Sequence, residues 1–343
     1  GSYSFMKRKG YPVIQLDAFV GFSGEQKNYY PRFRWDQESV FSWKEVKRVL
    51  GREKIFIPAQ YVFWNYIFDK EEPSLINSTT NGGGGMFSVD GAILSGLYEI
   101  IQRDAFLIYW LNALTPPKID PASVPDEMFQ IIFRESRRSV FRIYCLNTTL
   151  DTGVSSFVVV VEDPTGWPRF SLGGGCDANP ATALRHALEE AWSVYYLLRK
   201  KKIYSLPEQY VPFRTASIGR GERLRLLANP KMADKYSFLV SGKERKFSEI
   251  NFTFPMQFSN AHEELRCLAE SFVYGCDVYY YPSENRVLSY LNYHAVKVIV
   301  PRMVPLYLDE TFAPLGASRL KEIPRKLGYQ PAESINPWPH PFP

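Results

Sequence analysis

The chain has 343 residues, of which 45% are hydrophobic and 22% charged, a composition typical of a globular protein and not of a disordered one. Its 41 basic and 36 acidic residues leave a net charge of only +5, which is too mild for a dedicated nucleic-acid-binding protein. No segment approaches the roughly 20 consecutive apolar residues that a membrane span needs. We therefore expect a protein that binds neither nucleic acid nor membranes.

The four cysteines are Cys145, Cys176, Cys267 and Cys276, and they have neither Cys-x-x-Cys spacing nor a neighbouring histidine. A zinc site or a disulfide framework is therefore not expected. Unpaired thiols, together with the lack of an apolar signal segment after Gly1, predict a cytoplasmic protein.

The first eighty residues are rich in aromatic and β-branched side chains, and they predict short strands and turns, as in the segment from Gly51 to Tyr66. Four consecutive glycines, Gly82 to Gly85, then predict a tight loop and not a regular element. This loop leads into a long helix predicted from Val89 to Leu111, with Asp90 near its start.

A second glycine-rich segment, Leu172 to Cys176, predicts another loop. Asp177 or Asn179 can cap the following helix, which has Pro180 in its first turn and runs to about Arg199. The order strand, glycine loop, capped helix therefore occurs twice, without enough identity for a sequence repeat. Apolar runs between turn signals predict strands over 142–146, 155–161, 276–281 and 295–300, and a helix over 261–275.

The end of the chain is proline-rich from Pro331 to Pro343. Prolines stiffen the unbound chain, so a segment such as Pro339 to Pro343 loses little entropy when it inserts into a pocket. A disordered terminus or a docking peptide is the alternative. The chain is predicted to form one α+β domain over residues 1–330, with mixed or antiparallel sheets flanked by helices, followed by a tail over 331–343. The prediction allows for residues missing before Gly1.

On the first long helix, a spacing of 100° per residue places Ser95, Glu99 and Gln102 on one face with Arg103 beside them. The solvent-facing side of an ordinary amphipathic helix is an alternative explanation for this stripe. The second helix carries a similar stripe, which consists of His186, Glu190 and Ser193.

Two helices that each follow a glycine-rich segment and present a carboxylate could hold a Mg²⁺–polyphosphate between them, because Mg²⁺ often takes one or two carboxylates plus phosphate oxygens. Neither glycine segment has the Gly-Lys-Ser/Thr ending of a P-loop or a clean Gly-x-Gly-x-x-Gly pattern. A Walker or Rossmann site is therefore disfavoured, and the sequence has no Gly-x-Ser-x-Gly nucleophile elbow.

In combination, these motifs resemble the YcaO family of ATP-dependent enzymes that modify peptide backbones. The matching stretches are Ser78-Thr-Thr-Asn-Gly82, residues 92–105, residues 173–180 with 183–191, Val296-Lys-Val-Ile-Val-Pro301 and the terminal Pro-His-Pro-Phe-Pro. The resemblance runs from about residue 50 to the end of the chain, with the motifs in the family's order.

The family's first nucleotide motif is Ser-x3-Glu-x2-Glu-Arg, and it falls here on Ser95, Glu99, Gln102 and Arg103, so a glutamine replaces one acidic ligand. The second motif, Ser-x3-Glu, keeps Glu190 but has His186 in place of the serine. The resemblance implies ATP and Mg²⁺ as cofactors. It implies ATP binding by Ser95, Glu99, Gln102, Arg103 and Glu190, with Glu99, Gln102 and Glu190 as metal ligands. A third motif is not carried over, because Ser193 lies where a glutamine is usual.

The Pro-x-Pro-x-Pro end is similar to that of azoline-forming cyclodehydratases, which convert Cys, Ser or Thr of a ribosomal precursor peptide into thiazolines or oxazolines. The resemblance implies that the terminal carboxylate of Pro343, or His340, places or abstracts protons. It also implies a precursor peptide as substrate and a ThiF-like leader-binding protein, separate or fused, as partner; a homodimer is a further expectation. Two alternatives remain: a YcaO enzyme that forms thioamides or amidines, and a non-catalytic scaffold subunit suggested by Gln102, His186 and Ser193.

Overall fold

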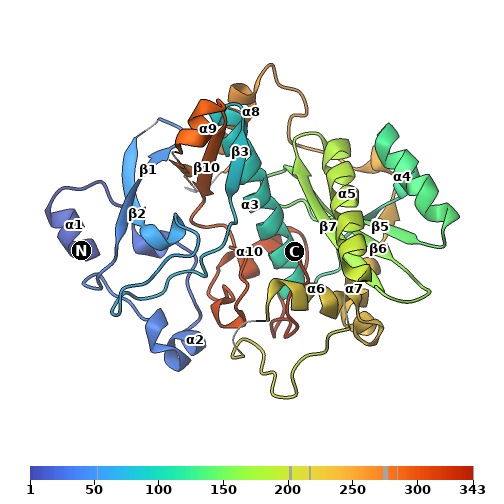
Figure 1. Cartoon of the computed structure of the whole chain (residues 1–343), viewed down its shortest axis with the longest axis horizontal. Helices are drawn as coiled ribbons and strands as arrows, with labels where there is room; N and C mark the ends of the chain where they lie inside the picture. Colours follow the sequence, from blue (N-terminus) through green and yellow to red (C-terminus); the bar gives the residue numbers. More distant parts are fainter. Residues whose placement is uncertain (52, 201–202, 216–217, 273–276, 284, 343) are drawn as a thin grey trace. The chain divides into compact units, whose positions relative to one another are not determined.

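A computed structural model describes the chain except for residues 52, 201–202, 216–217, 273–276, 284 and 343 (Figure 1). The described residues form two compact units. Unit 1 comprises Gly1–Asp104, Phe258–Tyr307 and Thr311–Arg319, and unit 2 comprises Ala105–Gln257, Leu308–Glu310 and Leu320–Pro343. Each unit contains a sheet and helices, which confirms the predicted α+β class.

The sheet of unit 1 has the strand order β2-β1-β9-β10-β3 within the described residues, and all its neighbouring strands are antiparallel. Buried side chains such as Val46, Ile57 and Ile299 form the core on this sheet. The strands are β1 (Trp43–Arg48), β2 (Lys54–Pro58), β3 (Gly83–Met86), β9 (Tyr279–Pro282) and β10 (His294–Ile299). The helices are α1 (Tyr3–Arg8), α2 (Gly24–Tyr29), α8 (Ala261–Ser271), α9 (Arg286–Tyr290) and the first part of α3 (Val89–Leu111).

The glycines before α3 do not form the predicted loop, because Gly83–Met86 is strand β3 and pairs with β10. The reason is the close packing of this strand against the helix that follows it. A Cβ atom on Gly84 would lie 2.0 Å from the carbonyl oxygen of Ala92, and one on Gly96 would lie 2.6 Å from the carbonyl oxygen of Gly82. Only glycine lets the two backbones approach this closely.

The sheet of unit 2 has the order β7-β6-β5-β4-β8 within the described residues, and only the β4–β8 pair is parallel there. Strand β6 is buried along its whole length. The strands are β4 (Lys118–Ile119), β5 (Arg142–Asn147), β6 (Ser155–Glu162), β7 (Phe170–Asp177) and β8 (Glu244–Arg245). The helices are α4 (Glu127–Arg138), α5 (Pro180–Arg199), α6 (Arg220–Ala228), α7 (Ala233–Val240), the end of α3, and α10 (Arg319–Lys326) from its second residue.

The second glycine-rich segment is also a strand and not the predicted loop, and helix α5 lies along it (Figure 1). A Cβ atom on Gly175 would lie 1.9 Å from the carbonyl oxygen of Ala183, and one on Gly173 would lie 2.3 Å from the nitrogen of Ala191. The physical reason is therefore the same as in unit 1: the glycines remove the side chains that would separate strand and helix.

The two long helices begin and end where the sequence predicts. Helix α3 spans Val89–Leu111, and α5 starts with Pro180 and ends at Arg199. Asn179 caps α5, because its Oδ1 accepts hydrogen bonds from the backbone N–H groups of residues 181 and 182 at 3.0 and 3.3 Å. Part of the predicted segment around Cys276 lies outside the described residues.

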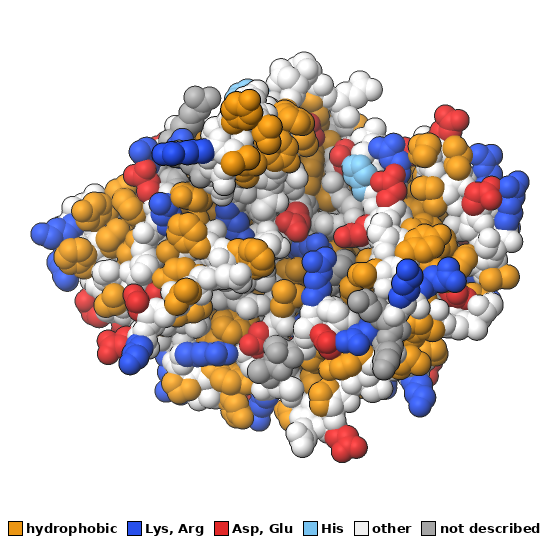
Figure 2. Space-filling view, viewed as in Figure 1, with side chains coloured by type: hydrophobic (Ala, Val, Ile, Leu, Met, Phe, Trp, Pro, Cys, Tyr) orange, Lys and Arg blue, Asp and Glu red, His pale blue; other side chains and the backbone are white. Residues whose placement is uncertain are grey.

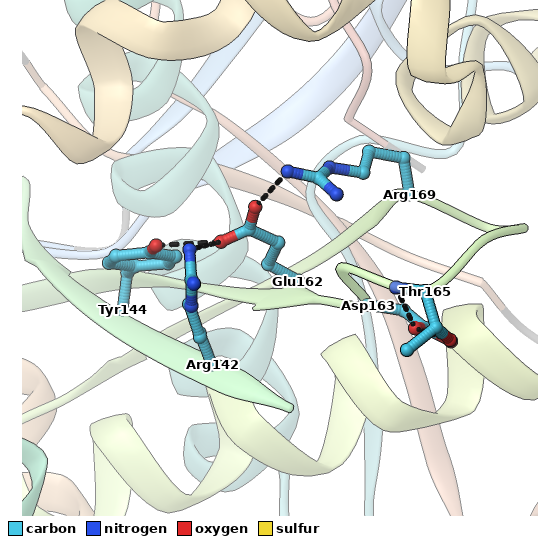
Figure 3. Close-up of polar contacts among 6 residues, drawn as sticks. All are labelled: Arg142, Tyr144, Glu162, Asp163, Thr165 and Arg169. Carbon is cyan, nitrogen blue, oxygen red and sulfur yellow. Dashed lines mark hydrogen bonds and ion pairs between the residues drawn. The ribbon is translucent and has the colours of Figure 1, made fainter. Parts of the chain in front are cut away.

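Two buried carboxylates stabilise the β6–β7 hairpin of unit 2 (Figure 3). Glu162 accepts a hydrogen bond from the Tyr144 hydroxyl at 2.7 Å and pairs with Arg169 Nη2 at 2.5 Å. Asp163 accepts from the backbone N–H and the hydroxyl of Thr165 at 2.9 and 2.6 Å. Burial tends to raise the pKa of Asp163, but the hydrogen bonds from Thr165 hold it below its usual value. The Glu162–Arg169 pair joins the end of β6 to the residue before β7, and the Thr165 contacts lie in the turn between these strands.

The proline-rich end of the chain is packed into unit 2. Residues 339–342 are buried, and the ring centroids of Phe342 and Phe106 are 4.5 Å apart. This burial agrees with the expected insertion of a stiff tail into a pocket, where the Phe342 ring packs on Phe106. Trp338 is half-buried, with its ring 5.1 Å from Lys235 Nζ.

Within the described parts of the chain, no helix combines the length and the apolar character needed to cross a bilayer.

Hydrophobic side chains gather at the upper edge of Figure 2, over α9 and the end of β3. The exposed apolar residues in these segments of unit 1 are Met86, Phe87, Val287, Tyr290 and Leu291.

Candidate functional site

In unit 1, the backbone that precedes α3 holds the side chain of Glu99. The Oε2 atom of Glu99 accepts a hydrogen bond from the Gly82 N–H at 2.8 Å, and Arg103 Nη2 lies 3.6 Å from Oε1. The Glu99 side chain is 28% exposed. It is therefore a carboxylate of fixed orientation that can still reach solvent, which suits a ligand for a cation.

The other predicted residues of the first motif lie on the same helix, so the structure brings this group together within unit 1. Ser95 is exposed, whereas Gln102 is only 8% exposed and Arg103 only 7% exposed. Burial gives a physical reason for the amide at position 102, because a neutral side chain costs less to desolvate than a carboxylate.

Lys297 on β10, which the sequence did not indicate as a site residue, fixes the loop in front of β3. Its Nζ donates hydrogen bonds to the carbonyl oxygens of Thr79 at 2.9 Å and Asn81 at 2.5 Å. Burial lowers the pKa of Lys297 to about 8, and the nearby negative charge of Glu99 opposes this shift. Lys297 therefore stabilises the loop that ends in Gly82, the donor to Glu99. A single charged residue inside the apolar run 296–301 was the available signal.

In unit 2, helix α5 presents Glu190 in a matching way. Glu190 Oε2 accepts a hydrogen bond from the Gly174 N–H of β7 at 2.6 Å, and the residue is half-buried. His186 and Ser193 of the same stripe are exposed. The Ser193 hydroxyl donates to the carbonyl oxygen of Glu189 at 2.9 Å, so it bonds to its own helix.

The two glutamates share one construction. Each lies on a helix packed against a glycine strand, and each accepts from a glycine N–H located 17 or 16 positions earlier in the chain. Glu99 belongs to unit 1 and Glu190 to unit 2. The described residues contain no group of three or more His, Cys, Asp or Glu side chains that could hold a metal. A single carboxylate such as either glutamate is compatible with Mg²⁺, which typically takes one or two carboxylates and completes its coordination with phosphate oxygens and water.

The two predicted catalytic residues lie at the end of the tail. His340 is fully buried in unit 2, and its carbonyl oxygen accepts a hydrogen bond from Arg223 Nη1 at 3.4 Å. Pro343 lies outside the described residues. Proton transfer by either residue stays a prediction.

Comparison with known proteins gives the family. The YcaO family profile, described as a YcaO cyclodehydratase that binds ATP and Mg²⁺, matches residues 1–304. This match covers most of the chain, so the α+β fold is that of a YcaO domain and the chain belongs to the YcaO family. ATP and Mg²⁺ are the cofactors of this domain.

Two curated relatives are uncharacterized proteins. One, from Methanothermobacter thermautotrophicus, is 26% identical over 157 residues, which cover 45% of this chain and 41% of the relative. The other is encoded in the tfuA 3′ region of Rhizobium leguminosarum bv. trifolii and is 26% identical over 161 residues, covering 43% and 37%. The matches therefore span about two fifths of the length of these relatives.

Solved structures share the fold. A heterocyclase in complex with substrate and cofactor has a TM-score of 0.78 and 21% identity, with 98% of this chain and 45% of that chain covered. The heterocyclase TruD has a TM-score of 0.74 and 22% identity, with 98% and 47% covered. YcaO from Methanopyrus kandleri, bound with AMPPCP and Mg²⁺, has a TM-score of 0.57 and 18% identity, with 76% and 64% covered.

Proposed function

We propose that this protein catalyses the ATP-dependent cyclodehydration of Cys, Ser or Thr residues in a ribosomal precursor peptide. The side chain attacks the preceding backbone carbonyl carbon, ATP phosphorylates the resulting oxygen, and phosphate leaves as the ring C=N bond forms. The peptide loses one water, and ATP yields ADP and phosphate. Phosphorylation is needed because an amide oxygen is otherwise a very poor leaving group.

The observation that carries this proposal is the paired orientation of Glu99 and Glu190 by glycine N–H groups. Phosphoryl transfer depends mainly on positioning and on neutralisation of phosphate charge, so rigid carboxylates for a metal are the feature to expect. Glu99 of unit 1 and Glu190 of unit 2 are each proposed as a Mg²⁺ ligand, and the cation would neutralise phosphate charge when bound. The nucleotide would be bound by Ser95, Gln102 and Arg103. Of these, Gln102 offers a ligand oxygen that carries no charge.

The buried tail supports an azoline former over a thioamide- or amidine-forming YcaO enzyme. A Pro-x-Pro-x-Pro motif is not expected in those enzymes, whose attacking group is an external sulfur or amine. In this proposal His340 and Pro343 are the residues that place or accept protons during ring formation.

A peptide-binding partner completes the proposal. The isolated chain should cyclise a full-length precursor slowly, and addition of a ThiF-like leader-binding protein should restore the rate. The proposal also includes a cytoplasmic location, where ATP is available, and a homodimer. Fast, leader-dependent turnover by the chain alone would contradict the need for a partner.

The test combines phosphate release with mass spectrometry. The chain, a ThiF-like partner and a precursor rich in Cys, Ser and Thr are incubated with Mg²⁺ and ATP. The proposal expects ADP, phosphate and the loss of one water per ring. Exchange of oxygen for sulfur would identify a thioamide-forming enzyme instead. Absence of both ADP and a mass change would favour the non-catalytic scaffold, which the residues Gln102, His186 and Ser193 suggest.

A further inference from the structure

A fully buried ion pair lies inside unit 2. Arg223 on α6 and Glu310 are both 0% exposed, and Arg223 Nη2 lies 2.5 Å from Glu310 Oε1. Burial of two charges costs several kcal/mol each, and this cost often cancels their attraction. A pair of apolar side chains would often be as stable, so the pair invites an explanation other than stability.

The guanidinium of Arg223 binds three separate segments of the chain. Its Nε donates to the carbonyl oxygen of Ile218 at 3.0 Å, and its Nη2 donates to that of Leu308 at 2.9 Å. Its Nη1 donates to the carbonyl oxygen of His340 in the tail at 3.4 Å. Because the guanidinium is planar and rigid, these contacts fix the three segments relative to one another.

The backbone of the tail offers a restricted set of hydrogen-bonding groups. Prolines 337, 339 and 341 have no N–H, so this stretch offers mainly carbonyl acceptors. Side-chain donors of unit 2 meet these acceptors one after another. The Tyr210 hydroxyl donates a hydrogen bond to the carbonyl oxygen of Pro337 at 2.7 Å. Trp110 Nε1 donates to the carbonyl oxygen of Trp338 at 3.0 Å, and Arg223 Nη1 donates to that of His340.

Arg223 is well suited to the last position in this row. Arginine has five N–H donors and no acceptor, so it suits a segment that offers mainly acceptors. It is also the member of the row that contacts the tail closest to the chain's end. Glu310 balances its charge in the interior without competing for the tail.

We propose that Arg223, with Glu310 as its counter-ion, is a positioning residue that sets where the last residues of the tail lie. The seating of the tail follows from the contacts alone. The consequence for catalysis rests on the proposed function, because it requires that the tail takes part in the reaction.

Hydrogen–deuterium exchange on the full chain tests the seating. The readout is the exchange rate of the tail amides at Trp338, His340 and Phe342. In Arg223→Lys the charge remains but the planar fork is lost, so exchange should rise by about tenfold, in line with the loss of a hydrogen bond to a charged group. The matched control is Arg319→Lys in unit 1, which alters another buried ion pair with Nη2 2.6 Å from Asp104 Oδ2. Exchange of the tail should not change in this control.

A second variant covers the case in which Arg223→Lys fails to fold. The double variant Arg223→Met/Glu310→Leu removes both charges at similar volume, so the fold should survive. Its tail amides should also exchange faster than in the parent. Unchanged tail exchange in a folded variant that lacks the arginine fork would overturn the proposal.

Kinetics separate this inference from the proposed function. With an active enzyme, Arg223→Lys should lower kcat for cyclisation by about tenfold or more while the KM for ATP stays constant. A released tail with unchanged kcat would overturn the catalytic consequence. If the parent protein cyclises no peptide, the proposed function fails, and the exchange data still decide whether Arg223 seats the tail.

Discussion

The β3–α3 region of unit 1 and the β7–α5 region of unit 2 have the same local geometry, although their strands differ in length and burial. In both, glycines let a strand pack on a helix, and a strand-side N–H orients a glutamate. Strand β3 has four residues and is partly exposed, whereas β7 has eight residues and is largely buried beside β6. Orientation of the carboxylate therefore depends on the strand–helix contact itself and not on the length or burial of the strand.

The surroundings of the two glutamates differ more than their anchoring. Glu99 has the cationic neighbours Arg103 and Lys297 in unit 1. In unit 2, the stripe around Glu190 continues with the exposed residues His186 and Ser193. The two positions are therefore equivalent in geometry but not in charge, and variants at both positions test this equivalence.

The largest effect is expected from removing either carboxylate. Glu99→Gln and Glu190→Gln should each lower phosphate release by about a hundredfold or more, because a metal ligand contributes several kcal/mol to charge stabilisation. The amide oxygen can still accept the glycine N–H, so the fold should survive. The control is Glu189→Gln, which removes an exposed carboxylate next to Glu190. Turnover at the parental rate in either test variant would refute the assignment.

The packing of strand on helix is tested by Gly84→Ala and Gly175→Ala. Each added methyl group would meet a helix carbonyl oxygen, so each variant should lose about 1–3 kcal/mol or more of unfolding free energy. Gly175→Ala should lower the unfolding free energy more than Gly84→Ala, because β6 pairs with β7 along its whole length. Denaturant unfolding measures both. Gly221→Ala in α6 is the control, since that Cβ meets nothing within 4 Å; it should stabilise by about 0.5–1 kcal/mol. Equal stability of Gly175→Ala and the parent would contradict the close approach.

The lowered pKa of Lys297, a cationic neighbour of Glu99, predicts that the stability of the protein depends on pH. The pKa of Lys297 is about 8 in the folded protein, against 10.5 for an unperturbed lysine. Between these values the unfolded chain binds more protons, so this residue makes stability rise with pH over that window. Lys297→Met should remove this contribution when unfolding free energies are compared from pH 7 to pH 10.5. A rise of the same size in both proteins would show that Lys297 does not cause it.

The smallest effect is expected at Gln102, the position where the first motif lacks a charge. Gln102→Glu should lower the Mg²⁺ concentration needed for half-maximal phosphate release severalfold, because a carboxylate is the stronger ligand for this hard cation. Since the residue is only 8% exposed, the variant should also be less stable than the parent without Mg²⁺. An increased Mg²⁺ requirement would argue against Gln102 as a ligand.

Local sequence signals predicted much of the fold. Periodicity and caps gave the bounds of α3 and α5, and the apolar runs gave β5, β6 and β10 to within one or two residues. The glycine segments were predicted as loops because a sequence shows the freedom of glycine but not the helix that packs against it. Whether such a segment forms a strand depends on the helix atoms that approach it, such as the carbonyl oxygens of Ala92 and Ala183.

The same limit applies to the site. Helical spacing placed Glu99 with Ser95 and Arg103, because those residues are one or two turns apart. Lys297 was missed because it lies 218 positions from Thr79, whose carbonyl oxygen it contacts. Arg223 was missed for the same reason, since 117 positions separate it from His340. Long-range hydrogen bonds leave no periodic signal in one sequence.

The place of the tail in unit 2 has a consequence for biosynthesis. Trp110, whose carbonyl oxygen accepts a hydrogen bond from Asn336, leaves the ribosome 226 residues before its partner. At typical translation speeds this delay is on the order of ten to fifty seconds. Until then the aromatic surface formed by Phe106 and Trp110 lacks the cover that Phe342 provides. We therefore expect chains that stop before residue 342 to expose this aromatic surface and to aggregate more readily than chains that include it.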